Sequence, residues 1–525
     1  MAIEKSIPRA ESAESIGINS SVVAKMTEEM AFAGINLHSL MIVKKGFVGV
    51  EAYGDNLSAD IPHMVYSVSK SFLATAYGFA LHEGKVTRET RFLDICPEFA
   101  PKKKDEYLEK LTIHHLVTMT AGKQPTIGNV KNGNRIKAFV ESKWIFSPGE
   151  SWRYVNDNYF VAAEMLYRIL GETITEYLTP RLYLPLGIEI PFWERSSNGV
   201  EAGGWGLMLK TEDMAKFILC YHNKGMYNGT RVIPAWWVKE ATAKYIDNND
   251  VEEHSDSAAG YGCGFWRCAG VENAYRAEGM FCQYAICLED YDACIVITSD
   301  HSDLQETLDV LWKYVPDMFD NQKTEKPRSV SLKKNESVVV RKRSSVEKSI
   351  SDKTYKFRRC KFVNAIGLPV SIFPMPVVLF ADECGGNMDS LKFVFCESGC
   401  DFSWVEDGGF ENKVHLSMIG KPVVSKVKVG ELNLSVHSFA YWENENTLVM
   451  RFRPLEAVAE RVLTFVFNGK RVKMYPSSVP GTGEKAKSTG NKLKCILKGR
   501  FFHWWIDFLV PKVDKILNPT HYGKI

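Results

Sequence analysis

A strongly basic stretch divides the chain into two parts with different hydrophobic patterns. Residues 323–359 contain 13 Lys and Arg against 4 Asp and Glu, a net charge of +9. Helix-like and strand-like patterns alternate before this stretch, whereas short alternating runs, typical of antiparallel strands, follow it at residues 391–395, 413–418, 447–452 and 462–467. At 525 residues the chain also exceeds the usual size of one hydrophobic core. We therefore predict two folded domains joined by a basic connector.

The pattern changes give the expected boundaries. We predict an α/β (α+β) domain over residues 1–320 and a connector over 321–359, which can include the first strand of the next domain. An antiparallel, β-rich accessory domain is expected over 360–479. A flexible basic link and a short amphipathic segment are expected over 480–525. The sequence leaves the role of the β-rich domain open between covering a flank of the first domain, roofing its active site and mediating dimerisation.

Charge and composition exclude several classes of protein. The chain carries 65 basic and 63 acidic residues, a net charge of +2, too balanced for a nucleic-acid binder. Residues 482–525 add +6 to the connector's +9, which leaves −13 on the remainder. The two basic segments are interpreted as solvated; contact with a polyanion or an anionic membrane is the alternative. A hydrophobic share of 45% and a charged share of 24% indicate a globular protein.

Cysteine spacing and the N-terminal sequence bear on cofactors and location. None of the 12 cysteines forms a Cys-x-x-Cys pair, and His114-His115 lacks a ligand partner at metal-binding spacing, so no zinc site is expected. The first 20 residues lack an apolar stretch typical of a signal peptide, and no membrane-spanning segment is predicted. We therefore expect a cytoplasmic protein with reduced thiols; the sequence does not predict its oligomeric state.

Periodicity places the main elements of the first domain. A hairpin is expected at residues 40–50, strands around Tyr275 and at 283–288 and 293–298, and helices at the following ranges: 67–82, 111–119, 158–170, 211–222 and 304–319. Asn156 or Asp157 is a candidate N-cap of the third helix, and a Thr-Glu-Asp sequence is expected to cap the fourth. Strand patterns at both ends, with helices between them, suggest a sheet assembled from distant segments plus an inserted helical subdomain.

One Ser-x-x-Lys sequence has the context that nucleophilic catalysis requires. Serine and lysine three apart lie on one helix face, where a neutral lysine can take the serine proton. The pattern occurs four times, at Ser67/Lys70, Ser331/Lys334, Ser345/Lys348 and Ser425/Lys428. Only Ser67 and Lys70 open an apolar helix, where desolvation can lower the lysine pKa. The alternative is that Ser67 only caps this helix.

Two further segments could complete an active site. In the first, Tyr154 could relay a proton to a leaving group, and Asn156 could hold Lys70 and a substrate carbonyl; helix capping by Asn156 explains the pair equally well. In the second, Gly279 at a strand edge would let substrate approach, and the peptide N–H groups of Met280 and Ser67 could form an oxyanion hole. An ordinary β-bulge is the alternative for Gly279.

The order and spacing of these motifs resemble the serine β-lactamase-related hydrolases, the superfamily of class C β-lactamases, penicillin-binding proteins and esterases. The resemblance covers roughly residues 15–320 and rests on four segments: Tyr-Ser-Val-Ser-Lys-Ser at 66–71, Thr-Ile-His-His-Leu-Val-Thr-Met-Thr-Ala-Gly at 112–122, Ser-Pro-Gly at 147–149 leading to Tyr-Val-Asn at 154–156, and Gly-Gly-Trp-Gly-Leu at 203–207 followed by residues 211–217. It implies an α/β sandwich with a helical subdomain, an acyl-enzyme on Ser67, Lys70 as base and Tyr154 as proton relay.

The third motif departs from the family pattern. Relatives often have Lys-Thr-Gly or His-x-Gly where this chain has Ala277-Glu278-Gly279, and commonly have glycine at the position of Cys282. Without the cation, a penicillin carboxylate loses its usual partner. Glu278 could favour an amine-bearing substrate, or Arg276 could neutralise it.

We therefore predict a cytoplasmic serine hydrolase that cleaves a small-molecule ester or amide through Ser67, without a metal or organic cofactor. The alternatives are a β-lactamase or a peptidase acting on D-amino-acid or cell-wall-type peptides, and a non-catalytic binding protein that retains the pocket. The intact Ser67, Lys70 and Tyr154 set argues against the binding protein, whereas Ala277 and Cys282 leave it open.

Overall fold

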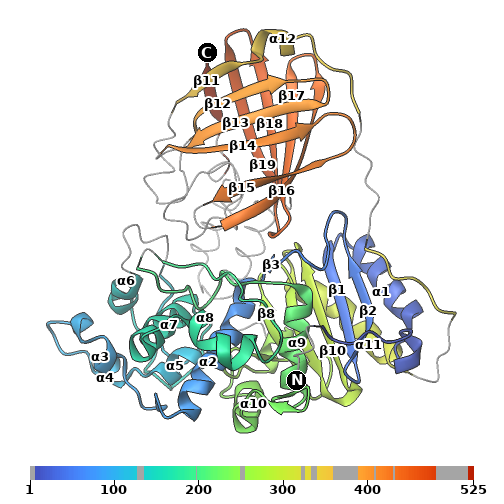
Figure 1. The fold of residues 1–525 in the computed structure, drawn as a ribbon. Coiled ribbons are helices and arrows are strands. Elements are labelled where there is room, and N and C mark those ends of the chain that lie inside the picture. The colour runs from blue at the N-terminus through green and yellow to red at the C-terminus, as the bar shows by residue number, and fades with distance from the viewer. Residues whose placement is uncertain are drawn as a thin grey trace, which may run out of the picture. The chain divides into compact units, whose positions relative to one another are not determined.

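The computed structural model contains two compact units, Met1–Lys333 and Lys334–Ile525. It describes residues 6–126, 135–196, 198–248, 255–320, 326–332, 340–358, 388–406, 409–429, 432–479, 518 and 520–525. Each unit has its own sheet, shown in Figure 1, and no strand is shared between the two sheets among the described residues. The two units are therefore described separately.

The first unit is built on a six-stranded antiparallel sheet assembled from distant parts of the chain. Its strands, in spatial order, are β2 (Phe47–Tyr53), β1 (Leu37–Lys44), β10 (Ala293–Ser299), β9 (Gln283–Leu288), β8 (Ala274–Gly279) and β7 (Trp266–Arg267). The pairing of β1 with β10 joins segments about 250 residues apart, with Leu40 opposite Ile297. The predicted hairpin and strands are confirmed.

Helices cover both faces of this sheet, as Figure 1 shows. On one face, α1 (Ser20–Phe32) and α11 (Leu304–Met318) pack on alternate strand residues such as Ile42, Ile286 and Ile295 in a fully buried core. On the other, α9 (Thr211–His222) packs against β1, β9 and β10. Because both faces are covered, the central strands are mostly apolar, with every residue of β1, β9 and β10 buried.

Apart from α9, the helices between β2 and β7 form a helical subdomain, as predicted. Its helices are α2 (Ser69–His82), α3 (Phe92–Ile95), α4 (Glu106–Lys110), α5 (Ile113–Val117), α6 (Arg135–Glu141), α7 (Asn156–Leu170), α8 (Ile174–Leu178) and α10 (Ala235–Thr242). All residues of α2 from Ser69 to Ala80 are buried. Helix α2 contacts α7, α8 and α10, so the helix that follows Ser67 forms the centre of this subdomain.

The two predicted caps are wrong. The N-cap of α7 is Val155, because the Asn156 side chain binds Lys70 and the Asp157 carboxylate accepts hydrogen bonds from the Thr126 backbone at 2.9 Å and hydroxyl at 2.8 Å. The N-cap of α9 is Lys210, since its first residues are likewise bound elsewhere. These side chains bind residues elsewhere in the fold and therefore do not cap the helix ends. The helix expected over residues 111–119 is shorter, Ile113–Val117.

The second unit is a ten-stranded antiparallel sheet that closes on itself through Ser417 of β14 opposite Phe439 of β16. Its strands, in spatial order, are β14 (Phe410–Ser417), β13 (Gly399–Glu406), β12 (Met388–Phe395), β11 (Lys353–Phe357), β20 (His521–Lys524), β19 (Arg471–Val479), β18 (Glu460–Asn468), β17 (Thr447–Pro454), β16 (Leu432–Asn444) and β15 (Val423–Val429). A short helix, α12 (Glu347–Ile350), precedes β11. The predicted antiparallel, β-rich C-terminal region is thus confirmed.

The first and last strands of this sheet in sequence order, β11 and β20, lie outside residues 360–479; a first strand within the connector was allowed for, whereas a strand near the C-terminus was not. Strand β11 falls within the basic connector and β20 within the C-terminal link, where the two pair through Lys356 and Lys524. The link at 480–498 and the amphipathic segment near residues 501–510 fall outside the described residues.

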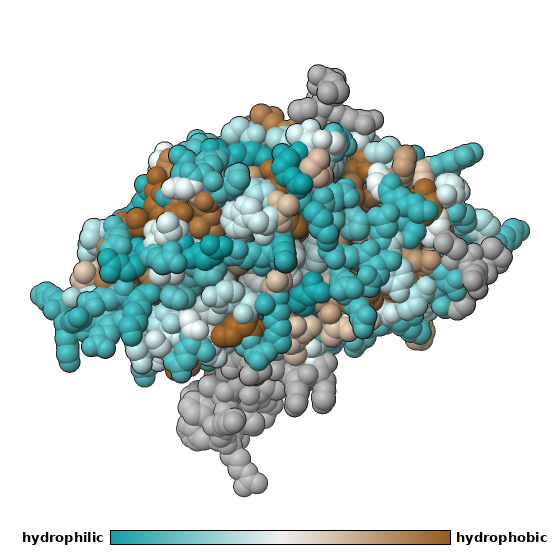
Figure 2. Space-filling view, turned by 90° about the horizontal axis from the view of Figure 1, so that it is seen from below, coloured by the Kyte–Doolittle hydropathy of each residue, from teal (hydrophilic) through white to brown (hydrophobic). Residues whose placement is uncertain are grey.

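The described surface is mostly hydrophilic on the face that Figure 2 presents, with hydrophobic residues in separate small groups. Individually exposed apolar side chains include Phe32, Ile190 and Trp236. Scattered exposure of this kind is normal for globular proteins. Among the described helices, none combines the length and the apolar character needed to cross a membrane.

Candidate active site

Ser67 lies in a tight turn that leads directly into the buried helix α2. Tyr66–Val68 form one turn of 3-10 helix, and Tyr66 adopts a φ of 47°, a left-handed conformation that bulky residues rarely adopt. The Ser69 hydroxyl donates to the Tyr66 carbonyl at 2.5 Å and accepts from the Leu207 backbone at 3.2 Å. Strain of this kind is typical of functional sites, and here neighbouring hydrogen bonds maintain it.

The turn leaves Ser67 reachable and Lys70 enclosed. Ser67 is half-buried, whereas Lys70 is only 1% exposed. The N-cap position of α2 is Val68, and no side chain there accepts a hydrogen bond from the first turn of the helix. Ser67 therefore does not cap this helix. Ser69 is fully buried within its backbone contacts, which leaves Ser67 as the accessible serine of the segment.

Three oxygen atoms surround the Lys70 amine. Its Nζ lies 2.8 Å from Ser67 Oγ, 2.9 Å from Asn156 Oδ1 and 2.7 Å from the Gly204 carbonyl oxygen. Burial lowers the pKa of Lys70 well below its usual value, and a more distant attraction to Asp157 only partly opposes this. A neutral amine has two N–H donors and one lone pair. The Asn156 and Gly204 oxygens can only accept, so in the neutral form both N–H groups are used there and the lone pair faces the Ser67 hydroxyl.

Gly204 is a site residue to which the sequence analysis assigned no role. A Cβ at this position would lie 3.3 Å from the Asn156 carbonyl oxygen and 3.4 Å from Lys70 Nζ. The neighbouring Gly203 has a φ of 66°, and a Cβ there would lie 2.6 Å from the Tyr159 carbonyl oxygen. In the sequence, only the Gly-Gly pair indicates this contact, because two residues without side chains allow the backbone to approach Lys70 closely.

Tyr154 is packed among aromatic rings beside Ser67. Its ring stacks on Trp266 with centroids 5.5 Å apart and meets Tyr261 edge-on at 6.2 Å. Burial raises the pKa of Tyr154 far above its usual value; a hydrogen bond with Ser67 partly offsets this effect, and the charge of Glu278 adds to it. The phenol therefore stays protonated at neutral pH. The Lys70 Nζ lies 5.0 Å from the centre of this ring.

Asn156 lies at the open side of the same group. It is the first residue of α7 and is exposed, with its Oδ1 directed to Lys70. The structure thus brings four of the predicted residues together: Ser67, Lys70, Tyr154 and Asn156. The Asn156 side chain binds Lys70 and does not cap α7, which was the alternative interpretation.

The end of β8 packs against the backbone that precedes Ser67. A Cβ on Gly279 would lie 2.2 Å from the Val65 carbonyl oxygen, so only glycine fits at this crossing. The Phe281 ring meets the Tyr66 ring edge-on at 5.2 Å. Because Gly279 contacts Val65 and Phe281 contacts Tyr66, Met280 lies next to the Ser67 turn. Met280 is 52% exposed, and the β8–β9 register is regular, which excludes a β-bulge at Gly279.

The turn after Met280 is held from within the sheet. Phe281 and Cys282 have φ values of 64° and 63°, both in the left-handed region. The buried Gln283 amide donates to the Phe281 carbonyl at 2.9 Å and to the Ser299 carbonyl at 2.7 Å. The Cys282 thiol lies 3.2 Å from Thr307 of α11, so its side chain points into the core behind the turn. Gln283 is a positioning residue that the sequence analysis did not single out.

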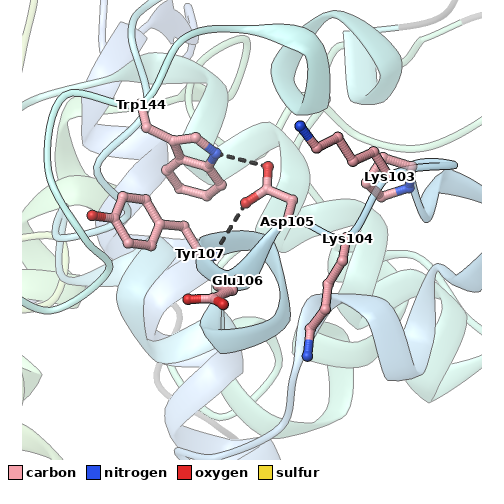
Figure 3. Close-up of a pocket in the computed structure, with 7 residues that line it drawn as sticks. Lys103, Lys104, Asp105, Glu106, Tyr107 and Trp144 are labelled. Carbon is pink, nitrogen blue, oxygen red and sulfur yellow. Dashed lines mark hydrogen bonds between the residues drawn. The ribbon is translucent and has the colours of Figure 1, made fainter.

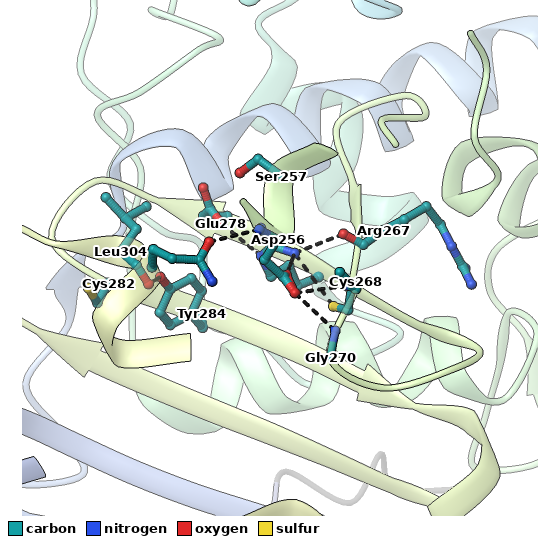
Figure 4. Close-up of polar contacts among 12 residues, drawn as sticks. Asp256, Ser257, Arg267, Cys268, Gly270, Glu278, Cys282, Tyr284 and Leu304 are labelled. Carbon is teal, nitrogen blue, oxygen red and sulfur yellow. Dashed lines mark hydrogen bonds and ion pairs between the residues drawn. The ribbon is translucent and has the colours of Figure 1, made fainter. Parts of the chain in front are cut away.

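Glu278 is part of an ion-pair network on β8, shown in Figure 4. Its carboxylate lies 2.6 Å from Arg276 Nε, and Arg276 Nη1 lies 2.6 Å from Asp256 Oδ2. Asp256 also accepts from Trp312 Nε1 at 3.0 Å. Arg276 is fully buried and Glu278 is 10% exposed at its side chain. Of the two readings of Glu278, the structure therefore shows pairing with Arg276, and two carboxylates share one guanidinium.

A separate cavity of about 570 Å³ lies at the start of α4 (Figure 3). Pro101, Lys103, Lys104, Asp105, Glu106, Tyr107 and Trp144 line it. Asp105 caps α4 through the Tyr107 and Leu108 backbone, each at 3.1 Å, and accepts from Trp144 Nε1 at 2.9 Å. Its carboxylate is thus used in structure, and none of the predicted site residues lines this cavity.

Comparisons with known proteins give one family and several similar structures. A model of the family described as Beta-lactamase matches residues 22–315. Among solved structures, this chain is similar to a family VIII carboxylesterase, with 16% identity, a TM-score of 0.47 and coverage of 59% of this chain and 98% of that one. It is also similar to a D-amino acid amidase from Ochrobactrum anthropi SV3, with 12% identity, a TM-score of 0.46 and coverage of 58% and 99%.

A third similar structure is the octameric penicillin-binding protein homologue from Pyrococcus abyssi, with 13% identity, a TM-score of 0.46 and coverage of 86% of this chain and 97% of that one. No curated protein sequence matches the chain.

Proposed function

Because the chain belongs to the Beta-lactamase family, we propose that it is a serine hydrolase that cleaves a small ester or amide through an acyl-enzyme on Ser67. The observation that carries this proposal is the buried Lys70 amine, 2.8 Å from an accessible serine hydroxyl and bound to two further oxygens that can only accept. A structural lysine in the same position would need an acidic partner to stay charged. The nearest carboxylate with a resolved influence, Asp157, is bound to Thr126.

In the proposed acylation step, the Ser67 oxygen attacks the substrate carbonyl while its proton passes to the Lys70 lone pair. The new carbon–oxygen bond pushes the carbonyl electrons onto the oxygen, which the backbone N–H groups of Ser67 and Met280 would stabilise. Asn156 would hold both Lys70 and the substrate. When the tetrahedral intermediate collapses, the leaving group takes a proton by way of Tyr154, and water later releases the acyl group by the reverse route.

The protonated state of Tyr154 decides its part in this scheme. A phenol whose pKa is raised cannot be a ready-made base at neutral pH, so Lys70 has that role. Tyr154 instead donates its proton and regains one from Lys70 through Ser67 or a solvent molecule. The aromatic neighbours Trp266 and Tyr261 would fix the direction of this donor.

The electrostatics of the site favour neutral or amine-bearing substrates. The network of Asp256, Arg276 and Glu278 has a formal charge of −1, and Ala277 supplies no cation where relatives have lysine or histidine. A carboxylate-bearing β-lactam would therefore meet net repulsion. We propose esters and amides, including aminoacyl groups, as the substrate class.

The experiment is a comparison of activated-ester hydrolysis by wild-type protein and two serine variants. Ser67→Ala should abolish turnover with the fold intact. Ser425→Ala is the matched control, because Ser425 also precedes a lysine by three residues but lies on strand β15, where residues three apart point to opposite faces. This control should retain full activity. A Ser67→Ala variant with more than a tenth of the wild-type rate would contradict the proposal.

A further inference from the structure

Three neighbouring strands of the first sheet place three sulfur- or oxygen-bearing side chains in one row. Tyr275 of β8 pairs with Cys287 of β9, and Cys287 pairs with Cys294 of β10. Residues directly opposite one another in antiparallel strands point to the same face. These three side chains therefore face α9, and all three are 1% exposed or less.

His222, the last residue of α9, completes the group. Its Nδ1 lies 3.4 Å from Cys287 Sγ, and the ligand atoms of His222, Cys287 and Cys294 all lie within 4.8 Å of one another. On the other side of the ring, Nε2 lies 2.8 Å from Asp292 Oδ1 in the β9–β10 turn. A metal-bound histidine typically donates its second ring N–H to a carboxylate in this way, which fixes the ring and its tautomer.

The Tyr275 hydroxyl is the second observation that points to a ligand. It is buried, and its interaction with the Cys287 thiol is not accompanied by any hydrogen bond of ordinary geometry among the residues that the structure describes. A buried hydroxyl of this kind costs free energy unless something binds it. The phenol oxygen is thus available on the same face as the two thiols.

We propose that His222, Cys287 and Cys294 bind a thiolate-preferring divalent cation such as Zn²⁺, with the Tyr275 oxygen at the fourth position. In a tetrahedral zinc site with ordinary Zn–N and Zn–S bond lengths, the nitrogen–sulfur edge is about 3.5 Å, close to the 3.4 Å between His222 and Cys287. Imidazole and thiolate ligands together select zinc over magnesium and calcium. Binding releases the two thiol protons, and the two thiolates balance the charge of the cation.

This site is separate from the Ser67 group. Strand β9 begins at Gln283, which holds the Met280 turn, and Cys287 lies four residues further along, about 13 Å at 3.3 Å per residue. The cation would thus sit at the opposite end of the sheet from the catalytic residues and link α9 to β9 and β10. His222 and Asp292, whose side chains are 11% and 59% exposed, form its route to solvent. The proposal does not depend on the proposed hydrolase activity.

The test is metal binding by the reduced full-length chain. Purified protein is stripped with a chelator, reduced, and titrated with Zn²⁺ for stoichiometry by elemental analysis and with Co²⁺ for its absorption spectrum. We expect one cation per chain and, with Co²⁺, the charge-transfer bands of thiolate ligation. Uptake well below one equivalent, or a cobalt spectrum without thiolate bands, would overturn the proposal.

Variants connect this binding to the named residues. Cys287→Ser and Cys294→Ser should each weaken binding at least 100-fold, and Asp292→Asn about 10-fold, because Asp292 only orients His222. The matched control is Cys96→Ala, since Cys96 is also a buried free thiol but lies in the helical subdomain. Unchanged binding in both cysteine variants would overturn the assignment. If these variants do not fold, Asp292→Asn is decisive, because Asp292 is exposed, and unchanged affinity there would count against the site.

Two further measurements separate this proposal from its alternatives. Mass spectrometry of unreduced protein would reveal a Cys287–Cys294 disulfide, and a disulfide together with no metal uptake after reduction would identify a redox pair and overturn the metal site. Ser67→Ala should bind Zn²⁺ like wild type, so loss of catalysis and loss of metal binding are distinguishable.

Discussion

Arg276 and Glu278 form a 2.6 Å ion pair on strand β8, next to the glycine that contacts the nucleophile turn. The two residues share a face because they are two positions apart. Asp256 also binds Arg276, so the network keeps one uncompensated negative charge. This pairing accounts for how the acidic Glu278 can lie in the third motif, beside Ala277 in the place of the usual cation, without destabilising the strand.

The first prediction concerns substrate preference. A substrate carboxylate about 4 Å from Glu278 would meet repulsion of roughly 1–4 kcal/mol before compensation by Arg276. The kcat/KM for neutral or amine-bearing esters and amides should therefore be at least tenfold higher than the kcat/KM for penicillins. Glu278→Gln should reduce the preference for amines and leave neutral esters within about threefold of wild type. Steady-state kinetics over p-nitrophenyl esters, aminoacyl amides and nitrocefin measures this, and faster hydrolysis of nitrocefin than of simple esters would refute it.

The second prediction concerns Lys70. Burial lowers the pKa of Lys70, and in the proposed mechanism Lys70 is the base, so Lys70→Arg should be nearly as inactive as Lys70→Ala because arginine keeps its proton. In wild type, kcat/KM should rise with pH as the Lys70 ammonium loses its proton and level off well below pH 10.5. Tyr154→Phe should be slower at every pH but keep this rise. Full activity in the arginine variant would mean that residue 70 supplies only charge.

The third prediction concerns the crossing of β8 and the Ser67 turn. In Gly279→Ala the new methyl group would meet the Val65 carbonyl and displace the Met280 N–H from the proposed oxyanion hole. Loss of one such donor typically costs 10²–10³-fold in rate, so kcat should fall by about 100-fold. Gly229→Ala serves as the control for backbone strain away from the site. A Cβ there meets no atom within 4 Å, but its φ of 74° makes alanine unfavourable. Equal activity of both variants would place the oxyanion donors elsewhere.

The fourth prediction concerns acid stability. Burial lowers the pKa of His114 to about 4. Below about pH 6.5 the unfolded chain therefore binds a proton at His114, whereas the folded chain does not bind it until about pH 4. The free energy of unfolding should therefore fall between pH 6.5 and pH 4, by up to about 3 kcal/mol from this residue. Denaturant unfolding of wild type and His114→Gln should show a shallower pH slope in the variant. Identical slopes would mean that His114 does not contribute.

Much of the site could be predicted because its chemistry is local in sequence. Ser67 and Lys70 are three residues apart, and the apolar residues after them predict the burial that lowers the lysine pKa. The same is true of the strands of both sheets, whose alternation or continuous hydrophobicity reflects one or two covered faces.

The features that the sequence did not predict depend on contacts between distant segments. The sequence left Asn156 open between holding Lys70 and capping the helix, and the structure shows its side chain bound to Lys70, 86 positions earlier. Gly204 contributes a carbonyl, which no side-chain pattern can reveal. His222, Cys287 and Cys294 have no recognisable spacing in the sequence and come together only when α9, β9 and β10 pack against one another.

The central claim is that Ser67 is the nucleophile, and covalent labelling tests it most directly. Wild-type protein is treated with a fluorophosphonate, digested, and analysed by peptide mass spectrometry. We predict one adduct per chain, on the Ser67 hydroxyl, and none in Ser67→Ala or in Lys70→Ala at neutral pH. An unlabelled wild-type protein, or an adduct on another serine, would contradict the account.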